Sequence, residues 1–156
     1  MELKEYQQEA LAAVDSYTTH LSEWKKKAEK NPDLEINFPV KAWEKTGMIG
    51  AYHSKRDGLG RYIPNFCLKI PTGGGKTFLA IKSLDKIFGN YLKRRTGIVL
   101  WVVPSEQIYS QTLKRLRDRN DPYRQHLDII SGGRTIIVET TDRFTPNDLN
   151  ENLVVL

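Results

Sequence analysis

Three consecutive glycines followed by lysine and threonine, in Pro71-Thr-Gly-Gly-Gly-Lys-Thr77, constrain the fold more than any other part of the sequence. The mostly apolar run Phe66–Ile70 precedes them, and residues 77–88 follow with apolar side chains at helical spacing. This pattern predicts a strand, a loop and a helix in succession. Glycines let successive backbone N–H groups surround phosphate oxygens, and the positive end of the following helix points at the same anion. The segment therefore predicts a loop that binds the phosphates of a nucleotide.

The motif gives each residue of this loop a role. In such a loop the lysine, here Lys76, reaches the β- and γ-phosphates, and the hydroxyl of Thr77 holds Mg²⁺. We therefore expect ATP and Mg²⁺ as cofactors, with Lys76 and Thr77 as the catalytic residues. The strict pattern G-x-x-x-x-G-K-[ST] is not met, because Ile70 stands where the first glycine belongs. The alternative is a flexible glycine turn before a helix with a surface lysine. The residues expected to contact the nucleotide in this loop are Thr72, Gly73, Gly74, Gly75, Lys76 and Thr77.

Helices and strands are expected to alternate along the rest of the chain. Apolar residues at helical spacing predict a helix over residues 3–30 that ends at Asn31-Pro-Asp33. Residues 31–65 are read either as loops around a short helix at Trp43 or as an ordered insertion. A second helix is expected after Ser105, which is a suitable N-cap. Strands are predicted at Phe66–Ile70, Gly97–Val103 (covered on both faces), His126–Ile130, Thr135–Val138 and Asn152–Leu156, with a tight turn at Ser131–Arg134.

This alternation predicts an α/β fold with a mostly parallel sheet. The sequence stops within an apolar run at Leu156, so we expect it to be a fragment of a longer protein. No apolar run approaches the roughly 20 residues that cross a bilayer, and the N-terminus lacks a secretion signal. The single cysteine, Cys67, excludes an internal disulfide and is expected to be buried in its strand. These features favour the cytoplasm and no membrane partner.

Three segments resemble motifs of superfamily-2 helicases and translocases. Ile70–Thr77 resembles motif I, and Leu3-Lys-Glu-Tyr-Gln7 resembles the upstream segment whose glutamine contacts adenine in that family. The resemblance implies that Gln7 contacts the adenine and that Tyr6 packs nearby. Val99–Thr112 resembles motif Ia, which touches the nucleic-acid backbone. By that likeness the expected nucleic-acid contacts are Pro104, Ser105, Gln111 and Arg115.

Residues 3–156 as a whole are similar to the first RecA-like domain of this superfamily, and most of all to the Res subunit of type III restriction enzymes. The resemblance implies a three-layer, RecA-like P-loop NTPase domain. Its expected parts are the adenine-contact helix at 1–30, an insertion or loop region at 31–65, and an ATP-binding core at 66–156 that is truncated at its C-terminus. The implied partners are DNA (with RNA left open), a second RecA-like domain, a nuclease domain and a modification methyltransferase subunit.

Two features leave alternatives open. The net charge of +5 permits contact with nucleic acid without requiring it. The basic residues Lys114, Arg115, Arg117, Arg119 and Arg124 are either a row of phosphate contacts or a solvated helix face.

The rival function is a P-loop NTPase that acts on a small molecule or a protein. A bare nucleotide-binding module is a third possible function. Gln7 and Pro104–Thr112 argue against the rival, because such an enzyme needs neither.

We predict that this chain alone binds ATP but hydrolyses it negligibly. The Asp-Glu-x-His or Asp-Glu-x-Asp box that activates water in the similar family does not occur in the sequence. A second domain would also have to supply arginine fingers, which contribute about 10³- to 10⁵-fold in rate. Steady-state phosphate release from the purified chain tests this. A turnover on the order of one per second, traced to the chain itself, would contradict it.

Overall fold

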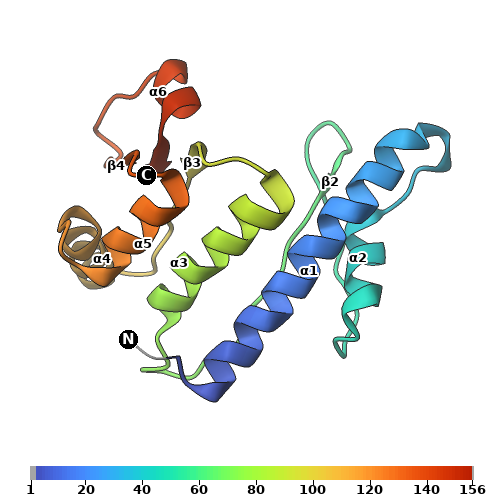
Figure 1. Ribbon diagram of the computed structural model, residues 1–156, viewed down its shortest axis with the longest axis horizontal. Helices are drawn as coiled ribbons and strands as arrows, with labels where there is room; N and C mark the ends of the chain where they lie inside the picture. Colours follow the sequence, from blue (N-terminus) through green and yellow to red (C-terminus); the bar gives the residue numbers. More distant parts are fainter. Residues whose placement is uncertain (1–2, 156) are drawn as a thin grey trace. The chain divides into compact units, whose positions relative to one another are not determined.

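The computed structural model describes residues 3–155, which form an α/β protein of two compact units (Figure 1). The first unit runs up to Leu79 and includes Asn90–Leu92; the second comprises Ala80–Gly89 and the chain from Lys93 onward. Helix α3 (Lys76–Lys86) and the π-helical turn η2 (Ile87–Leu92) contribute residues to both units. Within residues 3–155, no helix combines the length and apolar character that a membrane span needs.

Helix α1 (Glu5–Lys30) is the longest element of the first unit. Leu11, Val14, Tyr17 and Leu21 recur at helical spacing and are all buried, so the expected apolar face is confirmed. The helix ends at Lys30 because Pro32 follows and opens a short 3₁₀ turn, η1 (Pro32–Leu34). The 26 residues of α1 correspond to a length of about 39 Å.

The segment between α1 and the glycine loop is ordered. Helix α2 (Phe38–Thr46) contains Trp43 as expected, and it packs along α1 (Figure 1). Asn37 caps its first turn by accepting from the N–H of Val40, and Gly47 ends it with a φ of 68° that glycine adopts freely. Strands β1 (Lys55–Arg56) and β2 (Tyr62–Ile63) then pair as an antiparallel hairpin. The segment therefore has secondary structure of its own.

Aromatic side chains join α1, α2 and the chain leading to the glycine loop. The Tyr17 ring packs edge-on against Trp43 and Phe66, with ring centroids 5.7 and 6.1 Å away. The Tyr17 hydroxyl donates to that of Tyr52, which also accepts from the backbone N–H and the side-chain amide of Asn65. Burial and this contact raise the pKa of Tyr17 above its ordinary value, so it remains a neutral donor.

The predicted strand at Phe66–Ile70 is wrong, because these residues pair with no strand in the described chain. Phe66 instead faces the aromatic cluster around Tyr17. Apolar character predicts burial, but a strand also needs a hydrogen-bonded neighbour. Cys67 in this segment is exposed, so its predicted burial is also wrong.

The second unit contains a three-stranded parallel sheet. Strand β5 (Leu153–Val155) lies between β3 (Gly97–Val99) and β4 (Thr135–Ile137), with Val154 in register with Ile98 and Ile136. All three residues of β5 are buried, as a central parallel strand requires. Helices α4 (Glu106–Arg117) and α5 (Pro122–Ser131) connect β3 to β4, and α6 (Pro146–Glu151) connects β4 to β5. The predicted α/β class and parallel pairing are confirmed for this small sheet.

The segment predicted as a strand at His126–Ile130 is helical and belongs to α5. Asp121 caps the helix by accepting from Tyr123 N–H, and Pro122 occupies the first turn, where its missing N–H costs nothing. Buried Tyr123, Leu127 and Ile130 follow at helical spacing. The two glycines after Ser131 therefore end a helix, and the expected tight turn between strands is wrong.

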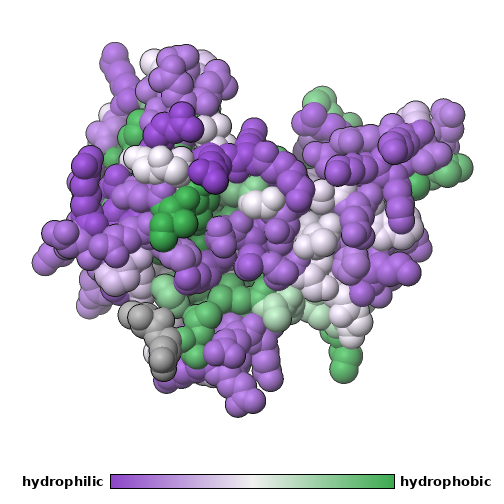
Figure 2. Space-filling view, in the orientation of Figure 1, coloured by the Kyte–Doolittle hydropathy of each residue, from purple (hydrophilic) through white to green (hydrophobic). Residues whose placement is uncertain are grey.

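Strand β3 is shorter and less covered than predicted. It ends at Val99, and beyond it Leu100 and Val102 are 67% and 79% exposed. The prediction of a strand covered on both faces up to Val103 is therefore wrong. The last strand starts at Leu153 as Asn152–Leu156 suggested, although Leu156 lies outside the described residues. In Figure 2 hydrophilic residues dominate the visible surface, and hydrophobic residues reach it in separate patches.

We predict that Tyr52→Phe destabilises the first unit. The change removes the acceptor for Tyr17 and Asn65 and leaves partly buried donors without a partner, which costs about 1–3 kcal/mol. Urea unfolding followed by aromatic fluorescence measures this cost. Tyr91→Phe is the matched control, because no hydrogen bond from the Tyr91 hydroxyl is present among residues 3–155. Equal midpoints for the two variants would refute the role given to Tyr52.

Candidate nucleotide-binding site

The glycine loop has a backbone shape that only glycine permits. Gly73 and Gly75 have φ angles of +75° and +79°, in the left-handed region where side chains are strained. A Cβ atom on Gly74 would come within 2.6 Å of Ile70 Cγ2 and 2.9 Å of the Pro71 carbonyl oxygen. The loop therefore needs glycine at all three positions, and of the three Gly73 has open space where a Cβ atom would stand.

Two side chains of α1 hold this loop in place. The Tyr6 hydroxyl and the Gln7 Nε2 both donate to the Gly74 carbonyl oxygen, over 3.1 and 2.9 Å. In a planar trans peptide the carbonyl and the next N–H point in opposite directions. Fixing the Gly74 carbonyl toward α1 therefore turns the Gly75 N–H away from α1. An anion on the side of the loop that faces away from α1 could accept a hydrogen bond from the Gly75 N–H.

Gln7 is buried and its amide is engaged at both ends. While Nε2 binds the loop, Oε1 accepts from the backbone N–H of Lys4 over 2.9 Å at the start of α1. This second bond satisfies one of the free N–H groups at the helix N-terminus. Gln7 thus links the first turn of α1 to the loop, and its predicted contact with adenine stays a prediction.

The loop ends where α3 begins. Lys76 is the first residue of α3, and its exposed Nζ donates back to the Pro71 carbonyl over 3.2 Å. The amine therefore lies across the glycines, where it could exchange this weak contact for phosphate oxygens. Thr77 lies in the first turn of α3, and Thr72 is exposed on the loop. Residues 3–155 contain no cluster of three His, Cys, Asp or Glu side chains fit for a metal.

These residues fit a nucleotide with its magnesium ion. Open space lies beside Gly73, the N-terminal end of α3 favours an anion, and Lys76 adds an exposed positive charge. Magnesium in such sites keeps water molecules and uses few protein ligands besides phosphate oxygens. A single hydroxyl at Thr77 is compatible with that requirement.

The predicted nucleic-acid contacts lie at the start and along the exposed part of α4. Pro104 and Ser105 are exposed, and Ser105 caps the helix by accepting from Ile108 N–H, so its predicted N-cap role is confirmed. Gln111 and Arg115 are four residues apart and share a helix face. Arg115, however, binds Asp121 through Nε over 2.8 Å and stacks on the Tyr123 ring. Its charge is therefore already partly compensated within the protein.

Other arginines of the basic cluster also have partners in the protein. Arg124 is buried and donates to Asp128 and to the carbonyls of Leu116 and Thr135. Its role is structural, because a buried guanidinium must be satisfied internally. The row therefore does not act as five free cations.

A separate network ties α4 to the loop after β4. Glu139 accepts from the Tyr109 hydroxyl and from Arg117, each over 2.6 Å, and its own N–H donates to Asp142. The bonds from Tyr109 and Arg117 lower the pKa of Glu139 and keep it charged. Because the folded pKa is depressed, the stabilisation is present at neutral pH and is lost as pH falls through it. No residue spacing in the sequence indicates this contact.

The glycine loop followed by α3, together with a parallel sheet connected by helices, defines an α/β protein of the phosphate-loop class. Residues 1–155 match the family described as type III restriction enzyme, res subunit. The match covers nearly the whole chain, and the chain belongs to this family. Membership implies a helicase-like, ATP-binding domain. No curated protein and no solved structure matched the chain.

Tyr6 was expected only to pack near the site, and its direct bond to the loop generates a prediction. Tyr6→Phe removes one of two donors to the Gly74 carbonyl, so we expect ATP to bind about 2- to 12-fold more weakly, as loss of one hydrogen bond implies. Titration calorimetry with a slowly hydrolysed ATP analogue and Mg²⁺ measures the change. Tyr91→Phe again serves as the control. An unchanged affinity for Tyr6→Phe would show that Gln7 alone suffices to hold the loop.

Proposed function

We propose that this chain is the ATP-binding part of a DNA translocase, the Res subunit of a type III restriction enzyme. The observation that carries the proposal is the Gly74 carbonyl bound by Tyr6 and Gln7, which orients the backbone of the glycine loop in a chain of this family. In the complete protein, ATP hydrolysis would drive movement on DNA. The proposed setting is the cytoplasm.

The proposed roles follow the positions of the side chains. The backbone from Thr72 to Gly75 surrounds the phosphates, and Lys76 leaves the Pro71 carbonyl to bind the β- and γ-phosphates. Thr77 holds Mg²⁺, which neutralises charge on the phosphates when it is bound. Gln7 contacts the adenine. We assign these roles to an adenine-contact helix at 1–30 and an ATP-binding core at 66–156, with residues 31–65 as an insertion between them.

The proposed DNA contacts lie at the N-terminal half of α4. Pro104 and Ser105 place the helix N-terminus, with its free N–H groups, at the surface where a backbone phosphate can approach. Gln111 adds a neutral donor further along the helix. Arg115 contributes through donors that its bond to Asp121 leaves available, since a guanidinium has five. A second RecA-like domain, a nuclease domain and a methyltransferase subunit are the proposed partners.

Calorimetric titration of an ATP analogue with Mg²⁺ tests the nucleotide site. We expect Lys76→Ala to weaken binding about 10- to 100-fold, because it removes charge-assisted bonds to phosphate. Lys69→Ala is the matched control, because Lys69 is an exposed lysine in the segment just before the loop. Similar losses in both variants would mean that general charge, not this loop, binds the nucleotide.

The same samples distinguish the translocase from its rival. We expect duplex and single-stranded DNA to bind with an affinity that falls steeply as salt rises, because phosphate contacts release counterions. Nucleotide binding without any DNA binding at low salt would instead favour a P-loop NTPase that acts on a small molecule or a protein.

A further inference from the structure

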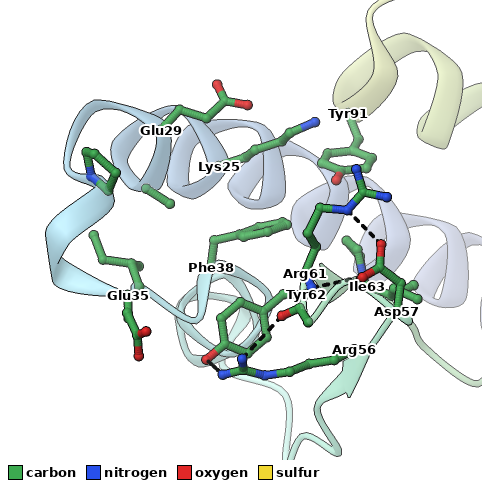
Figure 3. A pocket seen from close by; sticks show the side chains of 15 residues that line it. Lys25, Glu29, Glu35, Phe38, Arg56, Asp57, Arg61, Tyr62, Ile63 and Tyr91 are labelled. Carbon is green, nitrogen blue, oxygen red and sulfur yellow. Dashed lines mark hydrogen bonds and ion pairs between the residues drawn. The ribbon is translucent and has the colours of Figure 1, made fainter.

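The first unit contains a large pocket that the proposed ATP site does not use. Its volume is about 680 Å³, within the range of small-molecule sites. The last turns of α1, the chain between η1 and α2, the β1–β2 hairpin and Tyr91 form its walls (Figure 3). Its charged side chains are the cations Lys25, Arg56 and Arg61 and the carboxylates Glu29, Glu35 and Asp57, and its aromatic walls come from Phe38, Tyr62 and Tyr91.

The hairpin wall is held in shape by its own hydrogen bonds. Asp57 accepts from the N–H groups of Leu59 and Arg61 and binds Arg61 Nε over 2.7 Å. These bonds lower the pKa of Asp57, which therefore stays ionised at neutral pH. Arg56 lies over the Tyr62 ring, 4.2 Å from its centroid, and donates to the Tyr62 hydroxyl. The wall is preformed, so a ligand would not have to order it.

Cations and aromatic rings occur together on these walls. Lys25 lies 5.2 Å from the centre of the Tyr91 ring, and neither Lys25 nor Arg56 forms an ion pair with a carboxylate within residues 3–155. The bond from Arg61 to Asp57 uses Nε, and the Arg61 side chain stays 74% exposed. Figure 3 shows the Arg61 guanidinium beside the Tyr91 ring, on the same side of the pocket as the Lys25 amine. Glu29 and Asp57 also line this side, so their carboxylates offset part of its positive charge. An anion would bind here through direct hydrogen bonds that Lys25 and Arg61 can donate.

The opposite side of the pocket has a different character. In Figure 3 Glu35 lies across the pocket from Tyr91, with the Phe38 ring between them. Glu35 is exposed, and within the described chain it has no ion-pair partner. A carboxylate in that position accepts hydrogen bonds from an amino group and repels an anion. The pocket thus offers cationic donors beside two carboxylates at one end, aromatic rings in the middle and an acceptor at the other end.

We propose that this pocket binds one nucleotide unit of single-stranded nucleic acid whose base carries an amino group. The phosphate lies at Lys25 and Arg61, the base stacks against the aromatic walls, and Glu35 accepts from the exocyclic amino group, as acidic side chains do with cytosine. Lys25 and Arg61 alone would also attract an acidic peptide, but the negative charge of Glu35 repels such a peptide. The inference rests on the proposed function, because that function supplies the nucleic acid as ligand. It adds a nucleic-acid contact in the first unit to those proposed on α4.

Fluorescence anisotropy with labelled oligonucleotides of about 12 nucleotides tests the pocket. We expect oligo-dC to bind on the order of tenfold more tightly than oligo-dT, because thymine lacks the amino group. Lys25→Ala should weaken both several-fold and reduce the salt dependence by about one phosphate contact. Glu35→Gln should remove most of the preference for dC. Lys45→Ala, at an exposed lysine on α2 that does not line the pocket, is the matched control.

Two further measurements show whether a loss of oligonucleotide binding comes from the pocket or from misfolding of the variant. Binding of the ATP analogue to Lys25→Ala and Glu35→Gln should match the unmodified chain. Photo-crosslinking of an oligonucleotide with 5-iodocytosine to the unmodified chain should label the peptide that contains Tyr62. A crosslink confined to α4 would overturn the proposal.

The outcomes separate this inference from the proposed ATP site. If oligonucleotides do not bind while the ATP analogue does, the pocket proposal fails and the loop assignment stands. If Lys25-dependent binding of oligonucleotides persists while the ATP analogue does not bind, the pocket proposal stands and the assignment of the glycine loop fails. Equal losses in Lys25→Ala and Lys45→Ala would show general charge attraction and overturn the pocket. Displacement of oligo-dC by polyglutamate at equal charge would indicate a peptide site and overturn it too.

Discussion

The hydrogen bonds that Tyr6 and Gln7 donate to the Gly74 carbonyl fix the feature on which the proposed function depends. A glycine loop is free to take many shapes, and glycine loses more conformational entropy on ordering than any other residue. Two donors on one carbonyl select a single orientation of the Gly74–Gly75 peptide. The position that α1 holds therefore sets which way the backbone donors of the loop point.

Helix α1 brings this constraint together with the rest of the first unit. Its first turn binds the loop, its middle carries Tyr17 in the aromatic cluster, and its last turns carry Lys25 in the pocket wall. Tyr17 also packs against Phe66, a few residues before the loop. The segment that leads into the loop is thus held by the same helix that orients the Gly74 carbonyl. A mutation that weakens the aromatic packing around Tyr17 would therefore disturb the glycine loop both through α1 and through the segment that begins at Phe66.

The sequence predicted those parts of the fold that local signals determine. The apolar spacing along α1, the cap at Ser105 and the glycine loop before α3 depend on residues close together in the chain. The strand predicted at His126–Ile130 failed because an apolar run of that length fits either element. The cap at Asp121 and Pro122 was the local signal that could have corrected it.

Contacts between distant residues set the remainder. Whether Phe66–Ile70 pairs as a strand depends on a neighbouring strand that cannot be identified from these residues alone. In the structure Phe66 packs against the Tyr17 ring, and no strand pairs with this segment. The pairing of Arg117 with Glu139, 22 residues along the chain, likewise joins side chains with no common motif. Even Arg115 and Asp121, six residues apart, pair without a recognisable motif. A run of like charges in a sequence therefore overstates the number of cations available to a ligand. The glycine loop before α3 was predictable because its signal is local, whereas the pocket at Lys25 was not.

The two bonds of Gln7 do not prevent the adenine contact proposed for it. A glutamine amide has two N–H donors and two acceptor lone pairs, and the bonds to Gly74 and Lys4 use one of each. One donor and one acceptor remain, the pair that a bidentate contact with adenine N7 and N6 requires. If the bond to Gly74 persists when adenine binds, the base would stiffen the same side chain that orients the loop. Adenine recognition and phosphate binding would then be coupled through one amide, which a nucleotide lacking the amino group could not fully engage.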